Sequence, residues 1–218
     1  MSRCGMIIGI DEAGRGCIIG PMVICAAALN PLDEYKLKEM GVRDSKKLSP
    51  LQRENLYGKV GHLCKYTTVK VTAEELNVLM GHHNLNEIEA IKIAQAIDQL
   101  GIAGATVFVD SPDNVPAKFA RRIEKYVKTR VKIVSANKAD DTYVIVGAAS
   151  IIAKVTRDRE IEKIKKIVGF DFNSGYTSDP KTQHFIGKRR DYPAIEPYLR
   201  TRWSTLRTEK QKKLSEFE

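Results

Sequence analysis

Short apolar runs that end in turn-forming residues predict the strands of this protein. Within 66–71, β-branched residues alternate with other residue types, as in a strand with one buried face. The run 21–29 is apolar almost throughout, which is typical of a buried strand. The predicted strands are 6–8, 21–29, 66–71, 105–109 and 131–134.

Amphipathic repeats between these runs predict helices. In the segment 86–100, apolar residues recur at positions 88, 91, 94 and 97, which places them on one helical face that Gly101 ends. Ser49 and Pro50 are typical of an N-cap and a first helical residue. The predicted helices are 33–40, 50–62, 73–80, 86–100, 115–127 and one long helix that starts after Asp140 and ends near 168.

The order of these elements predicts an α/β fold. The strands come early and adjacent in the sequence and later alternate with helices, so one side of the sheet should be antiparallel and the other parallel. We expect a five-stranded mixed sheet flanked by helices in one domain at 1–168. Residues 169–218 are expected to form a basic, mostly helical extension that packs on this domain.

The charge distribution favours a polyanionic partner. The formal net charge is +9, and 181–213 holds ten Lys and Arg against three Asp and Glu. The four cysteines have no C-x-x-C spacing, which argues against a zinc site and a disulfide framework. No apolar run approaches the length of about 18 residues that spans a membrane, and no signal peptide precedes the first strand. We therefore expect a soluble, cytoplasmic monomer that binds no membrane.

The stretch 9–16 combines acidic residues with a glycine-rich, basic segment. Asp11 and Glu12 follow the first predicted strand, and the sequence Gly-Arg-Gly at 14–16 comes next. Carboxylates repel phosphate, whereas exposed backbone N–H groups and an arginine attract it. Both can serve one ligand when divalent metal ions stand between the carboxylates and a phosphate.

Two nucleotide-binding motifs are imitated in this stretch and can be rejected. A P-loop would require Lys and Ser or Thr where Arg15 and Gly16 stand, and a dinucleotide fingerprint would require its third glycine one residue before Gly20. Adjacent strand residues point to opposite faces, so Asp11 and Glu12 can reach one site only if the backbone turns there. The neighbouring glycines make such a turn accessible.

Two further carboxylates strengthen the case for a metal site. Asp110 ends the fourth predicted strand, and Asp140 precedes the long helix. Carboxylates at the ends of neighbouring strands can converge, and four of them require cations such as Mg²⁺ or Mn²⁺. Taken singly, each aspartate also suits a turn or a cap, and Asp11 and Glu12 suit a solvated strand end. The joint placement of the four acids argues for the metal site.

Several motifs occur in a fixed order up to about residue 180. They are Asp11-Glu12-Ala13-Gly14-Arg15-Gly16, Asp44-Ser45-Lys46, Asp110, Lys138-Ala139-Asp140, 148–158 and 174–180. Together they closely resemble the type 2 ribonucleases H, the ribonuclease HII family, in its archaeal form. The resemblance implies a ribonuclease H-like fold and metal-dependent endonucleolytic cleavage of RNA in RNA–DNA hybrids. It also implies cleavage at single ribonucleotides embedded in duplex DNA, leaving 5′-phosphate and 3′-hydroxyl ends.

The resemblance assigns roles to particular residues. Asp11, Glu12, Asp110 and Asp140 match the four acids that bind two Mg²⁺ or Mn²⁺ ions, and Asp140 rather than Asp141 has the family's spacing to the later serine. The other matches are Gly14, Arg15 and Gly16, which grip phosphate and the ribose 2′-OH, and Tyr176, which packs on the sugar at the ribo-to-deoxyribo junction.

Some positions depart from the family or suggest weaker roles. Cys17 stands where proline is usual and is expected to make the loop less rigid, and Gly147 replaces a common serine. Lys46 is a candidate phosphate contact, with a solvated loop lysine as the alternative. Lys154 and Arg157 are candidates to face the DNA backbone.

The stretch 211–217 is similar to the Q-x-x-L-x-x-F core of peptides that bind the sliding clamp PCNA. Gln211 begins this core, and Leu214 and Phe217 would share one face of a 3₁₀ turn. The usual second aromatic residue is missing, because Glu218 occupies its place. The alternative is the frayed end of a basic amphipathic helix.

Two other functions remain open at this point. One is another two-metal nuclease or strand-transfer enzyme on the same fold, which would also cleave or join all-DNA substrates. The other is a nucleic-acid-binding module without catalysis, against which the four intact acids argue.

Overall fold

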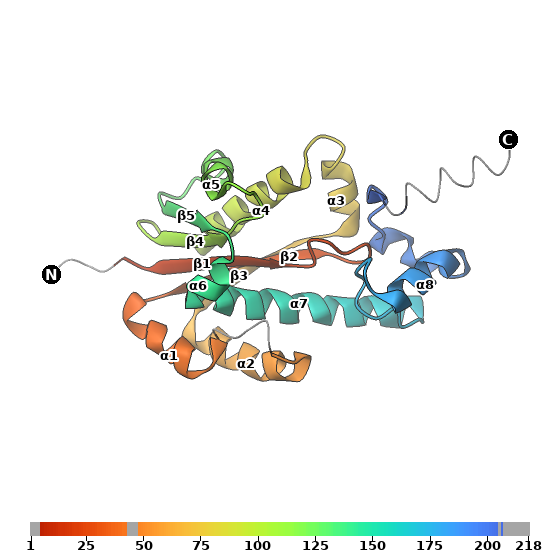
Figure 1. Ribbon diagram of the computed structural model, residues 1–218, viewed down its shortest axis with the longest axis horizontal. Helices are drawn as coiled ribbons and strands as arrows, with labels where there is room; N and C mark the ends of the chain where they lie inside the picture. Colours follow the sequence, from red (N-terminus) through yellow and green to blue (C-terminus); the bar gives the residue numbers. More distant parts are fainter. Residues whose placement is uncertain (1–4, 43–47, 205, 207–218) are drawn as a thin grey trace. The chain divides into compact units, whose positions relative to one another are not determined.

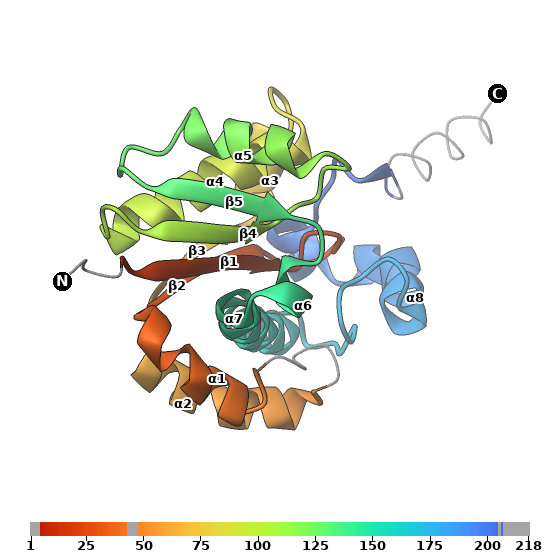
Figure 2. The same ribbon diagram turned by 60° about the vertical axis from the view of Figure 1, so that its left-hand side comes forward.

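A five-stranded mixed sheet, in the order β3-β2-β1-β4-β5, is the centre of the fold in the computed structural model. The structure describes residues 5–42, 48–204 and 206. β1 runs antiparallel to β2 and parallel to β4, and β4 runs parallel to β5, so the predicted mixed topology is confirmed. Figure 2 shows β1, β4 and β5 side by side. The strands are β1 Ile7–Ala13, β2 Met22–Leu29, β3 Lys65–Val71, β4 Thr106–Asp110 and β5 Lys132–Ala136.

The predicted helices are present with small shifts at their ends, and local caps explain several of the boundaries. The Ser49 side chain and Gln52 form a capping box at the start of α2, and Asn84 caps α4. Gly101 ends α4 in the left-handed conformation with φ 67°. The helices are η1 Pro31–Asp33, α1 Glu34–Glu39, α2 Pro50–Leu63, α3 Ala73–Leu79, α4 Leu85–Leu100, α5 Pro116–Glu124, α6 Ala139–Thr142, α7 Val144–Val168, α8 Pro180–Lys188, η3 Arg189–Asp191 and η4 Pro193–Tyr198.

Two predicted boundaries were wrong. The first strand does not end before the acids, because β1 continues to Ala13 and its last three residues pair with β2. The long helix is interrupted near its start: α6 ends at Thr142, and α7 begins at Val144 after the extended residue Tyr143. Asp140 therefore lies inside a short helix of its own.

The chain divides into two compact units that do not follow its order. Unit 1 comprises Met1–Ala13, Val23–Lys70 and Asn84–Thr156, and unit 2 comprises Gly14–Met22, Val71–His83 and Arg157–Glu218. The division at 168 and 169 that the sequence suggests stays a prediction.

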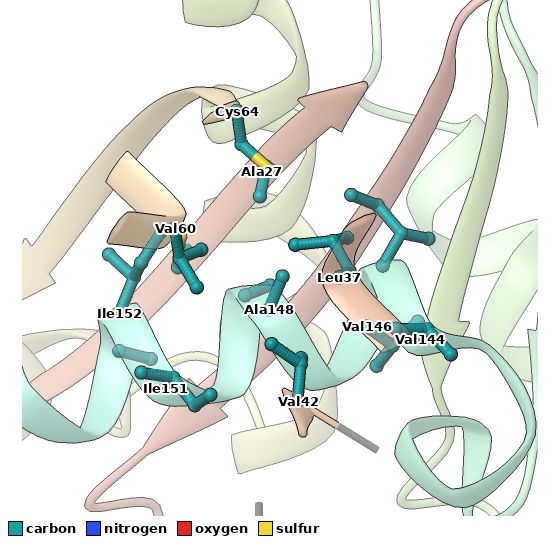
Figure 3. Close-up of a cluster of buried hydrophobic side chains, with 14 of the residues drawn as sticks. Ala27, Leu37, Val42, Val60, Cys64, Val144, Val146, Ala148, Ile151 and Ile152 are labelled. Carbon is teal, nitrogen blue, oxygen red and sulfur yellow. The ribbon is translucent and has the colours of Figure 1, made fainter. Parts of the chain in front are cut away.

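Unit 1 contains the sheet with helices on both of its faces. α4 and α5 cover one face, and the first part of α7 lies along the other, with α1 and α2 beyond it (Figures 1 and 2). Figure 3 shows the apolar contacts between these layers, where α7 presents small and β-branched side chains to Leu37 of α1 and Val60 of α2. Gly9 of β1 lies so close to α7 that an added Cβ would be 2.2 Å from the carbonyl oxygen of Ile145.

Unit 2 has a separate apolar core around aromatic side chains. Phe172 and Phe185 are fully buried, with ring centroids 5.5 Å apart, and Phe170 stacks on Phe185 at 4.9 Å. The Asp179 side chain caps α8 by accepting hydrogen bonds from the backbone N–H groups of Lys181 and Thr182. Among the described helices, none is both long enough and apolar enough to cross a membrane.

Candidate active site

Asp11 and Asp110 lie at the same end of two neighbouring parallel strands. The register of β1 and β4 pairs Ile10 with Val109, and each aspartate is the next residue along its strand. Parallel strands that share a register bring residues of equal offset to the same level. Both carboxylates therefore lie at the same end of the sheet, and each follows a buried β-branched residue.

Asp140 belongs to the same region, because the short helix α6 is hydrogen-bonded to the end of β4. The backbone N–H of Ala139 donates to Oδ1 of Asp110 at 2.8 Å. Lys138, just before α6, has φ 55°, a left-handed conformation that is uncommon for a residue with a side chain. Asp140 itself is 5% exposed, and its charge acts on Asp11. The structure thus brings three of the four predicted acids to one part of unit 1.

Burial perturbs the ionisation of Asp11. Burial raises the pKa of its carboxyl from 3.8 to about 6, and the negative charge of Asp140 adds to this effect. The Ser150 side chain, the ammonium group of Lys154 and the backbone N–H of Glu12, 2.9 Å from Oδ1, act in the opposite direction. The cost of removing the charged carboxylate from water therefore outweighs these favourable interactions.

This shift predicts a pH dependence of stability in the metal-free protein. The folded-state pKa of Asp11 is about 6 and the ordinary value is 3.8, so the folded protein holds this proton more tightly than the unfolded chain. The free energy of unfolding should therefore fall as pH rises from about 4 to about 6 and should then level off. Asp11→Asn should lack this fall, measured by urea unfolding in a chelator.

The exposed Asp141 supplies the control for that experiment. Asp141→Asn should keep the pH dependence of the wild-type protein. Equal pH slopes for wild type and Asp11→Asn between about pH 4 and about pH 6 would contradict the assignment.

Glu12 differs from the other acids because β1 continues through it. Glu12 pairs with Ile24 of β2 and is half-buried, so it is a residue of the strand and not of a turn. The expected turn comes later, at Gly14 with φ 81°. Among the residues that the structure describes, no group of three or more His, Cys, Asp or Glu side chains is arranged so that it could hold a metal ion.

The chemistry of the donor set nevertheless fits Mg²⁺ or Mn²⁺. Both ions prefer oxygen ligands, and carboxylates at the end of a sheet supply them. Burial, and to a smaller extent the charge of Asp140, raise the pKa of Asp11, and a cation bound beside this carboxyl would lower it. Asp11, Asp110 and Asp140, which lie in one region, are the candidate residues for such a site, and Glu12 is the nearest further carboxylate in the sequence.

The predicted Gly-Arg-Gly loop lies at the start of unit 2 and forms a turn. The backbone N–H of Cys17 donates to the carbonyl oxygen of Gly14 at 3.4 Å, with Arg15 and Gly16 between them. A Cβ at Gly14 would be 2.6 Å from the carbonyl oxygen of Pro21, whereas a Cβ at Gly16 would meet nothing within 4 Å. Gly14 is therefore required by the fold, and Gly16 leaves the turn open to a ligand.

Arg157 is buried beneath this turn, so the prediction that it faces DNA was wrong. It is 4% exposed, and its Nη2 donates to Sγ of Cys17 at 3.0 Å and to the carbonyl oxygen of Ser174. Its guanidinium lies over the ring of Tyr176, 5.0 Å from the centroid. The sequence does not reveal this burial, because the groups that contact Arg157, at Cys17 and at 174–176, come from other segments of unit 2.

Tyr176 and Cys17 are neighbours in the same cluster. They form an isolated antiparallel bridge, and burial raises the pKa of Tyr176 to about 12. Cys17 is fully buried, and burial also raises the pKa of its thiol, so it stays protonated at neutral pH. Cys17 is thus a packed part of unit 2 with a hydrogen bond from Arg157.

Sequence reasoning missed Arg200. Its side chain is fully buried and donates hydrogen bonds to the carbonyl oxygens of Gly14, Arg15 and Gly20. In the sequence, Arg200 is one arginine of a basic segment, and nothing there distinguishes it from the exposed Arg202.

Some predicted positions lie outside the described residues. They are Lys46 and the clamp-binding candidates Gln211, Leu214 and Phe217. Gly147, which replaces a serine of the family, lies in α7, where a Cβ would be 3.1 Å from the carbonyl oxygen of Val42.

The fold defines the class of protein first. The structure resembles that of Bst-RNase HIII in complex with Mn²⁺, with a TM-score of 0.78 at 21% identity, covering 94% of this chain and 68% of that one. At this identity the likeness shows the fold alone, and it is a ribonuclease H-like fold, as predicted.

Closer relatives show the family. The profile of the family Ribonuclease HII matches residues 8–206. The chain is 43% identical to ribonuclease HII of Pyrococcus horikoshii over 203 residues, 92% of this chain and 91% of the relative. It is 42% identical to ribonuclease HII of Archaeoglobus fulgidus over 212 residues, 97% of this chain and 100% of the relative.

Solved structures agree. The structure of ribonuclease H2 from Pyrococcus horikoshii has a TM-score of 0.86 at 42% identity and covers 95% of this chain and 98% of that one. That of the PCNA:RNase HII complex from Archaeoglobus fulgidus has a TM-score of 0.83 at 42% identity, covering 91% and 95%. The chain belongs to the ribonuclease HII family. It is a ribonuclease H, an endonuclease that hydrolyses phosphodiester bonds with the help of divalent metal ions.

Proposed function

We propose that Asp11, Glu12, Asp110 and Asp140 are the metal ligands with which this ribonuclease cleaves RNA paired with DNA. The register that places Asp11 and Asp110 side by side carries the proposal, together with the hydrogen bond that ties α6 to Asp110. Substrates are RNA–DNA hybrids and duplex DNA with single embedded ribonucleotides.

The proposed chemistry requires the acids in their charged form. Bound Mg²⁺ or Mn²⁺ would lower the pKa of an attacking water and stabilise the negative charge of the leaving 3′ oxygen. Asp11 must give up its proton to act as a ligand, and its pKa of about 6 makes this proton easy to displace at neutral pH. Cleavage of the bond between phosphorus and the 3′ oxygen leaves 5′-phosphate and 3′-hydroxyl ends.

The Gly14-Arg15-Gly16 turn is proposed to bind phosphate and the ribose 2′-OH. The 2′-OH is the local group that distinguishes a ribonucleotide from a deoxyribonucleotide, so a specific site must contact it. The open space at Gly16 allows close approach of the backbone, and Arg15 can pair with a phosphate. Tyr176 is proposed to pack on the adjacent sugar, and Lys46 stays a candidate phosphate contact.

Unit 2 also offers positive charge for the duplex backbone. Lys181, Lys188 and Arg190 are exposed. Contacts from such residues to phosphates release counterions, so we expect affinity for the duplex to fall steeply with salt.

A paired cleavage assay tests the proposed function. A duplex with one ribonucleotide should be cut at the ribonucleotide in Mg²⁺ or Mn²⁺, and an otherwise identical all-DNA duplex should stay intact. End-labelling of the cut strand identifies both termini. Cleavage of the all-DNA duplex would favour the alternative nuclease, and binding without cleavage in either metal would favour the non-catalytic module.

The C-terminus is proposed to bind a sliding clamp. The similar Archaeoglobus fulgidus protein has been solved in a complex with PCNA. Gln211, Leu214 and Phe217 provide the matching residues in this sequence. A chain that ends at Lys210 should bind PCNA at least about tenfold more weakly than the full chain, measured by calorimetry, because it lacks the apolar contacts of the motif. Equal affinities would contradict this role, and equal cleavage rates without PCNA serve as the control.

A further inference from the structure

Arg200 is buried at the point where the C-terminal part of unit 2 meets the Gly14-Arg15-Gly16 turn. Its backbone N–H donates to the carbonyl oxygen of Ile18 at 2.9 Å, and the preceding residue, Leu199, forms an isolated bridge with Ile19. The side chain is 0% exposed. These backbone contacts fix the place from which the guanidinium group reaches the turn.

Three N–H groups of this guanidinium hold the backbone of the turn and the residues after it. Nη2 donates to the carbonyl oxygen of Gly14 at 2.6 Å, and Nη1 donates to that of Arg15 at 2.8 Å. Nε donates to the carbonyl oxygen of Gly20 at 3.0 Å. The planar fork of an arginine can serve separate acceptors in this way, whereas the ammonium group of a lysine is a single point of charge.

The arrangement is unusual because all three of these acceptors are neutral main-chain oxygens. Burial lowers the pKa of Arg200 to about 10, and the positive charge of the nearby Arg157 acts in the same direction. The group still carries its proton at neutral pH. Its ring neighbour is Trp203, whose centroid lies 4.9 Å from Cζ. Burying a charged group whose three acceptors are neutral oxygens costs free energy, which indicates that the position of this guanidinium matters.

Peptide geometry shows what this position does. In a trans peptide the C=O and N–H groups point in opposite directions. The carbonyl groups of Gly14 and Arg15 point towards Arg200, so the N–H groups of Arg15 and Gly16 must point away from it. These two N–H groups therefore lie on the side of the turn away from Arg200. A Cβ at Gly16 would meet nothing within 4 Å, so the turn also has open space at this residue.

We propose that Arg200 is a positioning residue for ribonucleotide recognition: it orients the turn so that the N–H groups of Arg15 and Gly16 can bind phosphate and the 2′-OH. The inference rests on the proposed role of the turn. Arg200 itself lies behind the turn, and its effect on the substrate passes through the backbone.

Steady-state kinetics of the full chain in Mg²⁺ can test this role with Arg200→Lys. The KM for a one-ribonucleotide duplex should rise about tenfold, while kcat and the inhibition constant of an all-DNA duplex change less than about twofold. A purely structural role would instead lower the active fraction, which reduces apparent kcat and leaves KM unchanged. That result, or an unchanged KM in a folded variant, would overturn the proposal.

Matched variants complete the experiment. Arg202→Lys changes an exposed arginine of the same segment, which bonds to the carbonyl oxygen of Asn77, and should behave as wild type. If circular dichroism shows that Arg200→Lys does not fold, Trp203→Leu is the alternative. It removes the ring that lies against the Arg200 guanidinium and keeps the arginine itself. That variant should raise the same KM by about threefold, and an unchanged KM would overturn the proposal.

Gly16→Ala separates this inference from the proposed function. The added methyl group fits the fold but occupies the open side of the turn, so it should raise KM for the one-ribonucleotide duplex. An unchanged KM in Gly16→Ala would refute the recognition role of the turn and the inference together. A raised KM in Gly16→Ala beside wild-type values in Arg200→Lys would refute the positioning role alone.

Discussion

Asp140→Asn should lower kcat by about a thousandfold or more, while the neighbouring Asp141→Asn stays within about twofold of wild type. A ligand that loses its charge weakens metal-assisted stabilisation of the transition state, which is worth several kcal/mol. A loss of about 4 kcal/mol corresponds to about a thousandfold in rate. The two aspartates are adjacent in α6, but Asp140 is buried and acts on Asp11, whereas Asp141 is exposed.

The measurement is single-turnover cleavage of a one-ribonucleotide duplex at saturating Mg²⁺ and, separately, Mn²⁺. Thermal unfolding of both variants serves as the control for folding. Full activity in Asp140→Asn at saturating metal would remove Asp140 from the metal site. Equal losses in Asp140→Asn and Asp141→Asn would show that α6 as a whole, rather than one carboxylate, is required.

Gly9→Ala should destabilise unit 1 severely. The added Cβ would lie 2.2 Å from the carbonyl oxygen and 2.3 Å from the carbonyl carbon of Ile145, and 2.5 Å from the backbone nitrogen of Val146. These are main-chain atoms at the start of α7, so no side chain can rotate to make room. We expect a loss of about 3 kcal/mol or more, which lowers the melting temperature by roughly 10 °C in a chain of this size.

Gly58→Ala is the matched control for this substitution. Gly58 is exposed in the interior of α2, and a Cβ there would meet nothing within 4 Å. Alanine should therefore raise the free energy of unfolding by about 1 kcal/mol through helix propensity. A melting temperature of Gly9→Ala equal to that of wild type would show that β1 and α7 are farther apart than in this structure.

Much of the fold could be predicted from the sequence because it rests on local patterns. The apolar runs located all five strands and gave the bounds of four of them within a few residues, and caps such as Ser49 and Gly101 specified helix ends. The end of β1 was missed because the acidic pair Asp11 and Glu12 imitates a strand terminus. Pairing with β2 continues through both residues, and this pairing is a contact between segments.

Part of the candidate site could also be predicted from the sequence. Asp11 and Asp110 stand near the ends of strands whose parallel order can be inferred from the sequence, and Asp140 precedes the predicted long helix. The structure places all three in one region of unit 1. The direction of the Glu12 side chain depends on where β1 ends, and the pattern of residues does not predict that end. The candidate role of Arg157 at the DNA backbone was wrong because its contacts with Cys17 and Ser174 join distant segments of the chain.

The sequence by itself determined the order of the elements, the four acids, the Gly-Arg-Gly turn and the family. Periodicity, short motifs and the order of these motifs along the chain record these properties. Only the tertiary structure decided that Arg200 holds the carbonyl oxygen of Gly14, 186 positions away in the chain. It also decided that Gly9 must lack a side chain to let α7 approach. Such contacts depend on how distant segments pack, and a local pattern carries no record of them.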